Sequence, residues 1–106
     1  MTRINSIAVL AVMALMVPLA SAGSHIEKGK GVFDSKCLMC HNVDSKEKKI
    51  GPGLAGIKDG KLPSGKDATK ENTMEMVNKG GNGMPGYEAM LSEEERNTVV
   101  AYVLTL

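Results

Sequence analysis

The sequence has little of what usually builds a small protein core. Its 106 residues include no tryptophan, one phenylalanine and two tyrosines. A domain of this size normally needs a staple such as disulfides or a bound group. The chain has only two cysteines, which excludes a disulfide framework. A stable fold therefore requires apolar mass from another source.

An excess of charge of one sign is also missing. The sequence has 13 lysines and arginines against 12 aspartates and glutamates, and Arg3 belongs to an N-terminal segment that we expect to be removed. A nucleic-acid partner is therefore not expected. Internal repeats and low-complexity tracts are absent as well.

The two cysteines stand in the sequence Cys37-Leu38-Met39-Cys40-His41. A Cys-x-x-Cys-His segment is the signature of covalent c-type haem attachment. Each thiol adds to one vinyl group of the porphyrin, and the two-residue gap matches the separation of those vinyls. The histidine that follows is then placed to bind the iron. We predict one haem c held by Cys37 and Cys40, which supplies the missing apolar mass.

Two other interpretations of the cysteine pair are less well supported. A thioredoxin-like dithiol needs a βαβ context, and the chain shows no such pattern. A structural zinc site needs two more ligands, and His25 is the one histidine left besides His41.

Residues 1–22 have the pattern of a cleaved signal peptide. Arg3 provides a positive start, Ile7–Ala20 is an apolar run, and the segment ends in small residues. The 14-residue run is too short to span a bilayer comfortably, although an uncleaved anchor is the alternative. We expect residues 23–106 to be one exported monohaem domain, periplasmic or otherwise outside the cytoplasm, without stable membrane insertion.

The remaining patterns predict an all-α fold of three to four short helices around the haem. A first helix is expected over 27–36, where Ile26, Gly29 and Phe33 share one face. Gly29 costs helix propensity, which a close helix crossing would justify. A further helix over 69–78 is expected to turn Met74 and Val77 inward and to stop at the glycines that follow.

The last helix has the clearest signals. Ser92 and Glu95 form a capping box, and an apolar stripe follows at Val99, Tyr102, Val103 and Leu106. We expect this helix to cross the first one, with Phe33 and Tyr102 near the contact.

The mature chain resembles a class I cytochrome c, most closely the small bacterial and cytochrome c6-like carriers. The resemblance rests on Gly29-x-x-x-Phe33, the Cys37–His41 segment, Gly51-Pro52-Gly53-Leu54, Met84-Pro85 and Ala101-Tyr102. It implies that His41 is the proximal iron ligand and Met84 the distal one. It also implies that the Pro52 carbonyl accepts a hydrogen bond from the other ring nitrogen of His41.

Met84 is preferred over the other sulfur and nitrogen ligands of the mature chain. It lies in a glycine-rich loop, Gly80–Tyr87, whose backbone we expect to be free to bring the thioether close to a flat ring. Met39 lies beside the proximal histidine, and His25 is expected to be an exposed terminal residue. Three more methionines are expected to fill core gaps: Met74, Met76 and Met90.

An iron with both ligands in place has no position for a substrate. We therefore expect a one-electron carrier, not an enzyme, whose thioether ligand raises the redox potential. Loss of Met84 should give weak peroxidase activity. The alternatives are a haem enzyme or a gas or peroxide sensor in which Met84 dissociates, and a cytochrome subunit of a larger oxidoreductase.

Charge is unevenly distributed along the mature chain. Residues 23–66 carry nine lysines against five acids, and residues 67–106 carry three basic residues against seven acids. By the resemblance, lysines lie near the exposed haem edge, and we expect a monomer whose redox partners present an acidic patch there. The expected lysines are Lys36 and Lys79, with Lys46, Lys48 and Lys49 as further candidates.

Overall fold

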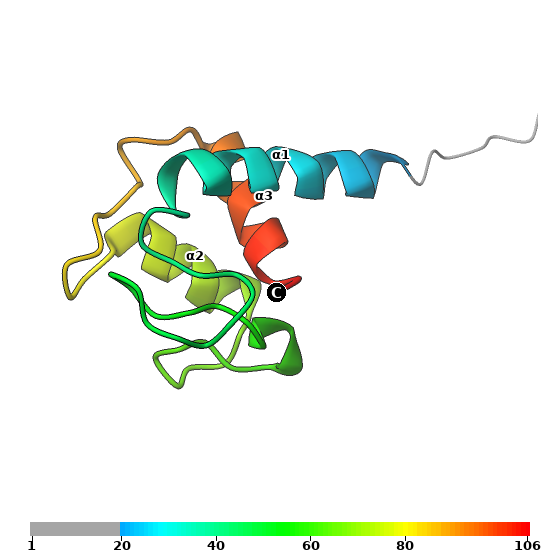
Figure 1. Ribbon diagram of the computed structural model, residues 1–106. Helices are drawn as coiled ribbons and strands as arrows, with labels where there is room; N and C mark the ends of the chain where they lie inside the picture. Colours follow the sequence, from blue (N-terminus) through cyan, green and yellow to red (C-terminus); the bar gives the residue numbers. More distant parts are fainter. Residues whose placement is uncertain (1–19) are drawn as a thin grey trace, which may run out of the picture.

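The computed structural model describes residues 20–106, which form three α-helices and one short 3-10 helix (Figure 1). In chain order these are α1 (Ala20–Lys36), the 3-10 helix η1 (Ile57–Asp59), α2 (Lys70–Lys79) and α3 (Glu93–Val103). Strand pairing within this part of the chain is limited to two isolated bridges. The all-α prediction is confirmed.

The predicted signal peptide lies outside the described residues, apart from its last three positions. None of the helices in residues 20–106 has the length and apolar character needed to cross a membrane.

Helices α1 and α3 cross, as Figure 1 shows. Gly29 of α1 lies against the α3 backbone at this crossing. A Cβ atom on Gly29 would stand 1.9 Å from the backbone oxygen of Thr98 in α3. One helical turn further along α1, the rings of Phe33 and Tyr102 meet edge to face with their centroids 5.4 Å apart. The predicted crossing, and the reason for a glycine in the helix, are both confirmed.

Helix α1 begins at Ala20, seven residues before the predicted start. The intervening segment contains no proline, and extending an existing helix is far easier than starting one. The prediction of the start was therefore wrong, whereas its predicted end at Lys36 is correct.

Helix α2 begins and ends as its sequence signals indicate. The Thr69 side chain accepts a hydrogen bond from the Asn72 backbone N–H at 3.0 Å, and Gly80 ends the helix with φ 62°. Val77 packs against the core as predicted, while Met74 is only half-buried. The buried residue of this helix is Thr73, whose hydroxyl donates to the Thr69 carbonyl at 2.7 Å.

Helix α3 has the predicted capping box: Ser92 Oγ accepts from the Glu95 N–H, and the Glu95 carboxylate accepts from the Ser92 N–H. Because α3 packs against both α1 and α2, its buried surface is wider than the predicted stripe and includes Thr98 and Val100. Leu106 lies beyond the helix end, where its carbonyl accepts from the Gly56 N–H at 3.0 Å.

The core collects apolar side chains from the helices and from the long α1–α2 connection. Its buried members are Phe33, Leu54, Ile57, Leu62, Val99, Tyr102 and Val103.

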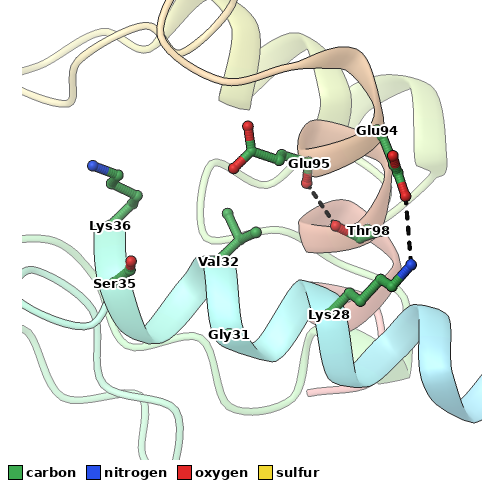
Figure 2. Close-up of a pocket in the computed structure, with 8 residues that line it drawn as sticks. All are labelled: Lys28, Gly31, Val32, Ser35, Lys36, Glu94, Glu95 and Thr98. Atoms are coloured by element: carbon green, nitrogen blue, oxygen red, sulfur yellow. Dashed lines mark hydrogen bonds and ion pairs between the residues drawn. The ribbon is translucent and has the colours of Figure 1, made fainter.

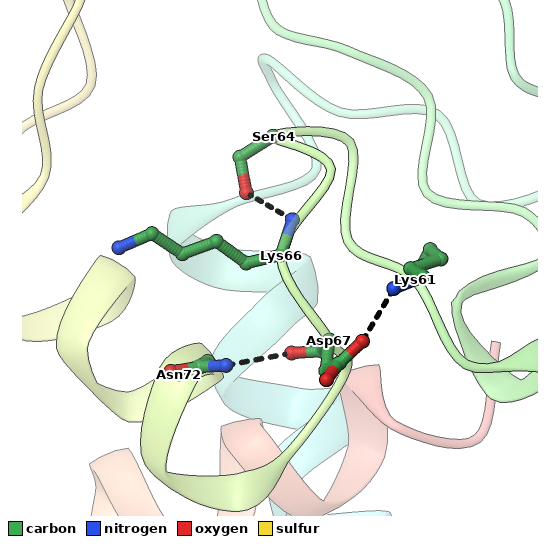
Figure 3. Close-up of polar contacts among 5 residues, drawn as sticks. All are labelled: Lys61, Ser64, Lys66, Asp67 and Asn72. Carbon is green, nitrogen blue, oxygen red and sulfur yellow. Dashed lines mark hydrogen bonds and ion pairs between the residues drawn. The ribbon is translucent and has the colours of Figure 1, made fainter.

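The last part of the α1–α2 connection is a small closed loop before α2 (Figure 3). Lys61 forms an ion pair with Asp67, and the Asn72 side chain donates to the Asp67 carbonyl at 3.0 Å. The Ser64 hydroxyl accepts from the Lys66 N–H at 3.4 Å. Within this loop Leu62 is buried, whereas Lys61 and Lys66 are exposed.

Candidate functional site

The cysteine pair occupies a tight turn at the end of α1. The N–H groups of Cys37 and Leu38 donate to the Phe33 carbonyl at 2.8 and 3.0 Å. The N–H groups of Cys40 and His41 then donate to the Cys37 carbonyl at 3.1 and 3.0 Å. Both thiols are therefore held by the backbone of one turn, which we call the attachment turn (residues 37–41).

The environment of Cys37 does not suit a redox-active dithiol. Burial raises the pKa of the Cys37 thiol to about 11, and the nearby Cys40 adds to the effect. Catalytic dithiols need the opposite, a lowered pKa that provides a thiolate at neutral pH. The structure thus gives no support to the dithiol interpretation.

His41 is held by two consecutive residues of the following loop. Its Nδ1 lies 2.7 Å from the Pro52 carbonyl oxygen. Because a carbonyl can only accept, Nδ1 carries the hydrogen, and Nε2 of the neutral ring keeps its lone pair. A Cβ on Gly51 would stand 2.7 Å from His41 Cε1, so the imidazole occupies space that only glycine leaves open. The contact with Pro52 is the one that the resemblance implied.

Met84 lies in a tight hairpin, not in a free loop. The N–H of Gly81 donates to the Met84 carbonyl at 2.9 Å, and the N–H of Met84 donates to the Gly81 carbonyl at 3.0 Å. The two central residues, Asn82 and Gly83, have φ of 52° and 90°. Positive φ at both central positions is the requirement of a type I′ turn. The expected freedom of this backbone was wrong, because hydrogen bonds fix it.

A second restraint on the hairpin comes from Gly80. Its Cβ would stand 2.3 Å from the Met84 oxygen and 2.6 Å from the Pro85 carbonyl carbon. The backbone before Met84 therefore passes directly over the backbone after it.

The expected burial of the other methionines is partly wrong. Met90 is 60% exposed and Met76 is 38% exposed, so neither fills the core. Both methionines lie near apolar helical patterns in the sequence, but that proximity does not bury them. Met76 is on an outer face of α2, and Met90 belongs to a turn. His25 is exposed, as expected, and so is Met39. Met84 is half-buried.

Tyr87 is a site residue that was not predicted. Its hydroxyl donates to the Lys36 carbonyl at 3.1 Å, which joins the methionine hairpin to the last residue of α1. The pKa of Tyr87 is raised, first by burial and then by the nearby Cys37 and Cys40. The sequence signal was present, since Tyr87 is one of three aromatic residues and lies in a glycine-proline loop.

A shallow groove lies between α1 and α3, lined by charged residues of both signs (Figure 2). Lys28 pairs with Glu94 at 3.6 Å, and Lys36 is near enough to Glu95 to lower its pKa slightly, after the larger effect of the Ser92 hydrogen bonds. The groove contains none of the predicted haem-site residues. The charge distribution along the sequence had suggested that Lys36 lies away from the acidic residues. The mixed charge of the groove shows that it lies close to them.

Comparison with known proteins identifies the family. The sequence profile of cytochrome c matches residues 26–106. The chain therefore belongs to the cytochrome c family, and its fold is the all-α cytochrome c fold.

Individual relatives agree with this assignment. Cytochrome c6 from the diatom Phaeodactylum tricornutum has a similar structure, with a TM-score of 0.61 and 29% identity over 76% of this chain and 91% of that one. Cytochrome c-554(547) of Halothiobacillus neapolitanus is 29% identical over 74% of this chain and 92% of its own length. Cytochrome c type-1 of Ascaris suum is 55% identical over 40 residues, a match that spans 36% of that protein.

Family membership implies a covalently bound haem c, and the residues present fit that group. Two thiols lie in one turn at the required spacing. The contact of His41 Nδ1 with the Pro52 carbonyl leaves Nε2 as the ring nitrogen that could bind a metal, and Gly51 leaves the space that the imidazole occupies. A thioether and an imidazole are a known pair of haem-iron ligands in cytochromes c, and Met84 is the residue that would provide the thioether.

Proposed function

We propose that this protein is an exported one-electron carrier whose single haem c is attached through Cys37 and Cys40, with His41 and Met84 as iron ligands. The hydrogen bond from His41 to Pro52 is the observation that carries the proposal. It fixes the imidazole tautomer and orientation that a metal ligand needs. Histidines that serve only as surface residues have no need of such a restraint.

The restraints on His41 and Met84 are the reason that electron transfer, and not substrate chemistry, is the proposed role. When bound, haem c supplies a reversible one-electron couple. Pro52 holds the His41 ring in place, and the hydrogen-bonded hairpin holds Met84. With both side chains as ligands, no coordination position is left for a substrate.

Met84 and the apolar side chains near the attachment turn would favour the reduced state of the haem iron. A thioether ligand raises the potential relative to a second imidazole. Apolar surroundings act in the same direction, because the oxidised centre carries one more positive charge. The buried Leu54 and Phe33 and the half-buried Val43 provide such surroundings close to the attachment turn.

We further propose a redox partner with an acidic patch that faces the lysines of residues 46–49. Lys49 Nζ donates to the Leu38 carbonyl at 3.1 Å, so this lysine run lies against the attachment turn. Lys46 and Lys48 are exposed. Lys79 contributes less than the sequence suggested, since it pairs with Glu75 at 3.4 Å. Opposite charge on the partner would steer encounter more than it strengthens binding.

Export is proposed from residues 1–22, which are expected to be removed so that the mature protein begins near Gly23. The mass of the protein recovered outside the cytoplasm tests this, because retention of residues 1–22 would show an anchored form instead. The proposed mature protein is a monomer.

A redox titration of the purified holoprotein, recorded with its visible spectrum, tests the function. A reversible one-electron couple with a thioether-to-iron charge-transfer band in the oxidised form is expected. Rapid CO binding by the ferrous protein at neutral pH would favour the sensor or enzyme alternative. Co-purification in a stoichiometric complex would favour a subunit of a larger oxidoreductase.

A further inference from the structure

We propose that Tyr87 is a positioning residue that keeps Met84 on the iron by tying the methionine hairpin (residues 80–87) to the end of α1, directly before the attachment turn. This inference rests on the proposed His41 and Met84 ligation. Its basis is the hydrogen bond from the Tyr87 hydroxyl to the Lys36 carbonyl at 3.1 Å, which joins positions 51 residues apart.

Among the described residues, the other hydrogen bonds that anchor residues 80–87 to a helix all go to α2. The N–H of Gly80 donates to the Met76 carbonyl at 2.8 Å, and the N–H of Tyr87 donates to the Val77 carbonyl at 2.8 Å. Within residues 20–106, the Tyr87 hydroxyl makes the only hydrogen bond between residues 80–91 and residues 36–41. It therefore connects the half of the site that carries Met84 with the half that carries His41.

Lys36 is a suitable acceptor because α1 ends there. Carbonyls in the last turn of a helix have no partner within the helix. The Phe33 carbonyl accepts from Cys37 and Leu38, and the Cys37 carbonyl accepts from Cys40 and His41. Among the described residues, the Lys36 carbonyl has Tyr87 as its partner. Tyr87 is 8% exposed, and its hydrogen bond to Lys36 is partly buried.

The bond must break when the hairpin moves away with Met84. Its strength therefore adds to the cost of releasing the ligand but leaves the attachment turn unchanged. A hydrogen bond of ordinary net strength corresponds to roughly fivefold in an equilibrium. An exogenous ligand that binds only the released state gains apparent affinity in proportion to the population of that state.

The test compares two identical chemical changes, Tyr87→Phe and Tyr102→Phe, in the haem-loaded protein. Tyr102 is also buried, and it packs against Phe33 at the α1–α3 crossing. Within the described residues its hydroxyl makes no hydrogen bond to the methionine hairpin. The ferric protein is titrated with imidazole, and the decrease of the charge-transfer band is recorded as the measure of Met84 release.

We expect Tyr87→Phe to bind imidazole about fivefold more tightly than wild type, and Tyr102→Phe to bind as wild type does. Unfolding by denaturant is measured in parallel, since a merely structural role would lower stability without changing imidazole affinity. Equal imidazole affinity in all three proteins would overturn the proposal for Tyr87. If the wild-type protein lacks the band, the ligation itself is wrong, which is a different failure.

Discussion

Replacing Gly29 with alanine should destabilise the protein, whereas Gly31→Ala, two residues later in α1, should stabilise it. A Cβ at Gly29 would stand 1.9 Å from the Thr98 oxygen and 3.0 Å from the Tyr102 Cβ. A carbon–oxygen contact normally needs about 3.3 Å, so α1 and α3 would have to separate by more than about 1 Å. A Cβ at Gly31 would meet nothing within 4 Å.

The magnitudes follow from the two surroundings. Overpacking costs about 1–3 kcal/mol, and the upper end applies at Gly29 because the obstacle is backbone, which cannot change rotamer. Alanine is more stable than glycine within a helix by roughly 0.5–1 kcal/mol. At Gly29 the helix gain of alanine offsets part of the overpacking cost, so Gly29→Ala should lower the free energy of unfolding by about 2 kcal/mol. Gly31→Ala should raise it by about 0.5–1 kcal/mol, because only the helix gain applies there.

Denaturant unfolding of the two haem-loaded variants, followed by circular dichroism, measures the difference. Loss of the edge-to-face contact between Phe33 and Tyr102 should accompany the destabilisation. If both alanines shift the midpoint in the same direction, the crossing is not where the structure places it.

Three further predictions concern the haem, the last helix and the partner. After denaturation and acid extraction, the mature protein should still weigh one haem more than its polypeptide chain. Cys40→Ala should leave a single thioether, through Cys37, and should lower the yield. Release of haem from the wild-type protein by acid extraction would contradict this prediction. Ser92→Ala should lower the free energy of unfolding by about 1 kcal/mol through loss of the N-cap. Hydrogen bonds from Ser92 lower the pKa of Glu95, so this carboxylate stabilises the folded state at neutral pH and should lose that effect as pH falls through its folded-state pKa; a wild-type stability that is flat in acid, or rises, would be inconsistent. Lys48→Glu should slow electron transfer to an acidic partner at low ionic strength and change little at high salt, because screening shortens steering to about 10 Å at about 0.1 M; a salt-independent rate would point to an apolar contact.

Much of the helical frame could be predicted because its signals are local. The Ser92–Glu95 capping box lies within four residues, and the glycine that ends α2 follows its last turn directly. The crossing at Gly29 could be inferred because a glycine inside a helical pattern needs a reason. The structure provides that reason in the Thr98 backbone.

The features that were missed depend on contacts between distant segments. Thr98 and Thr73 are polar yet buried, since the Thr98 hydroxyl donates to the Glu95 carbonyl of α3 and the Thr73 hydroxyl donates to the carbonyl of Thr69, the N-cap of α2. The connection around Ile57 has no sequence periodicity, and its burial depends on Gly56 and Gly60, which adopt positive φ. A local pattern contains no information about such packing.

In the candidate site, too, the local features could be predicted from the sequence and the contacts between distant segments could not. The attachment segment is contiguous, so its chemistry could be read directly from Cys37 to His41. The Asn82-Gly83 pair is a strong signal for a type I′ turn, so the hairpin around Met84 is predictable from the sequence. The Tyr87 contact with Lys36 spans 51 residues, and no spacing rule predicts it.

Ligation of the iron by His41 and Met84 can be tested with the oxidised-state spectra of Met84→Ala and Met90→Ala. Met90 is a matched control because it is six residues away in the same connection and is largely exposed. We predict that Met84→Ala abolishes the thioether-to-iron charge-transfer band, lowers the potential and opens the iron to imidazole, while Met90→Ala keeps all three properties of the wild type. A band that survives in Met84→Ala and disappears in Met90→Ala would contradict it.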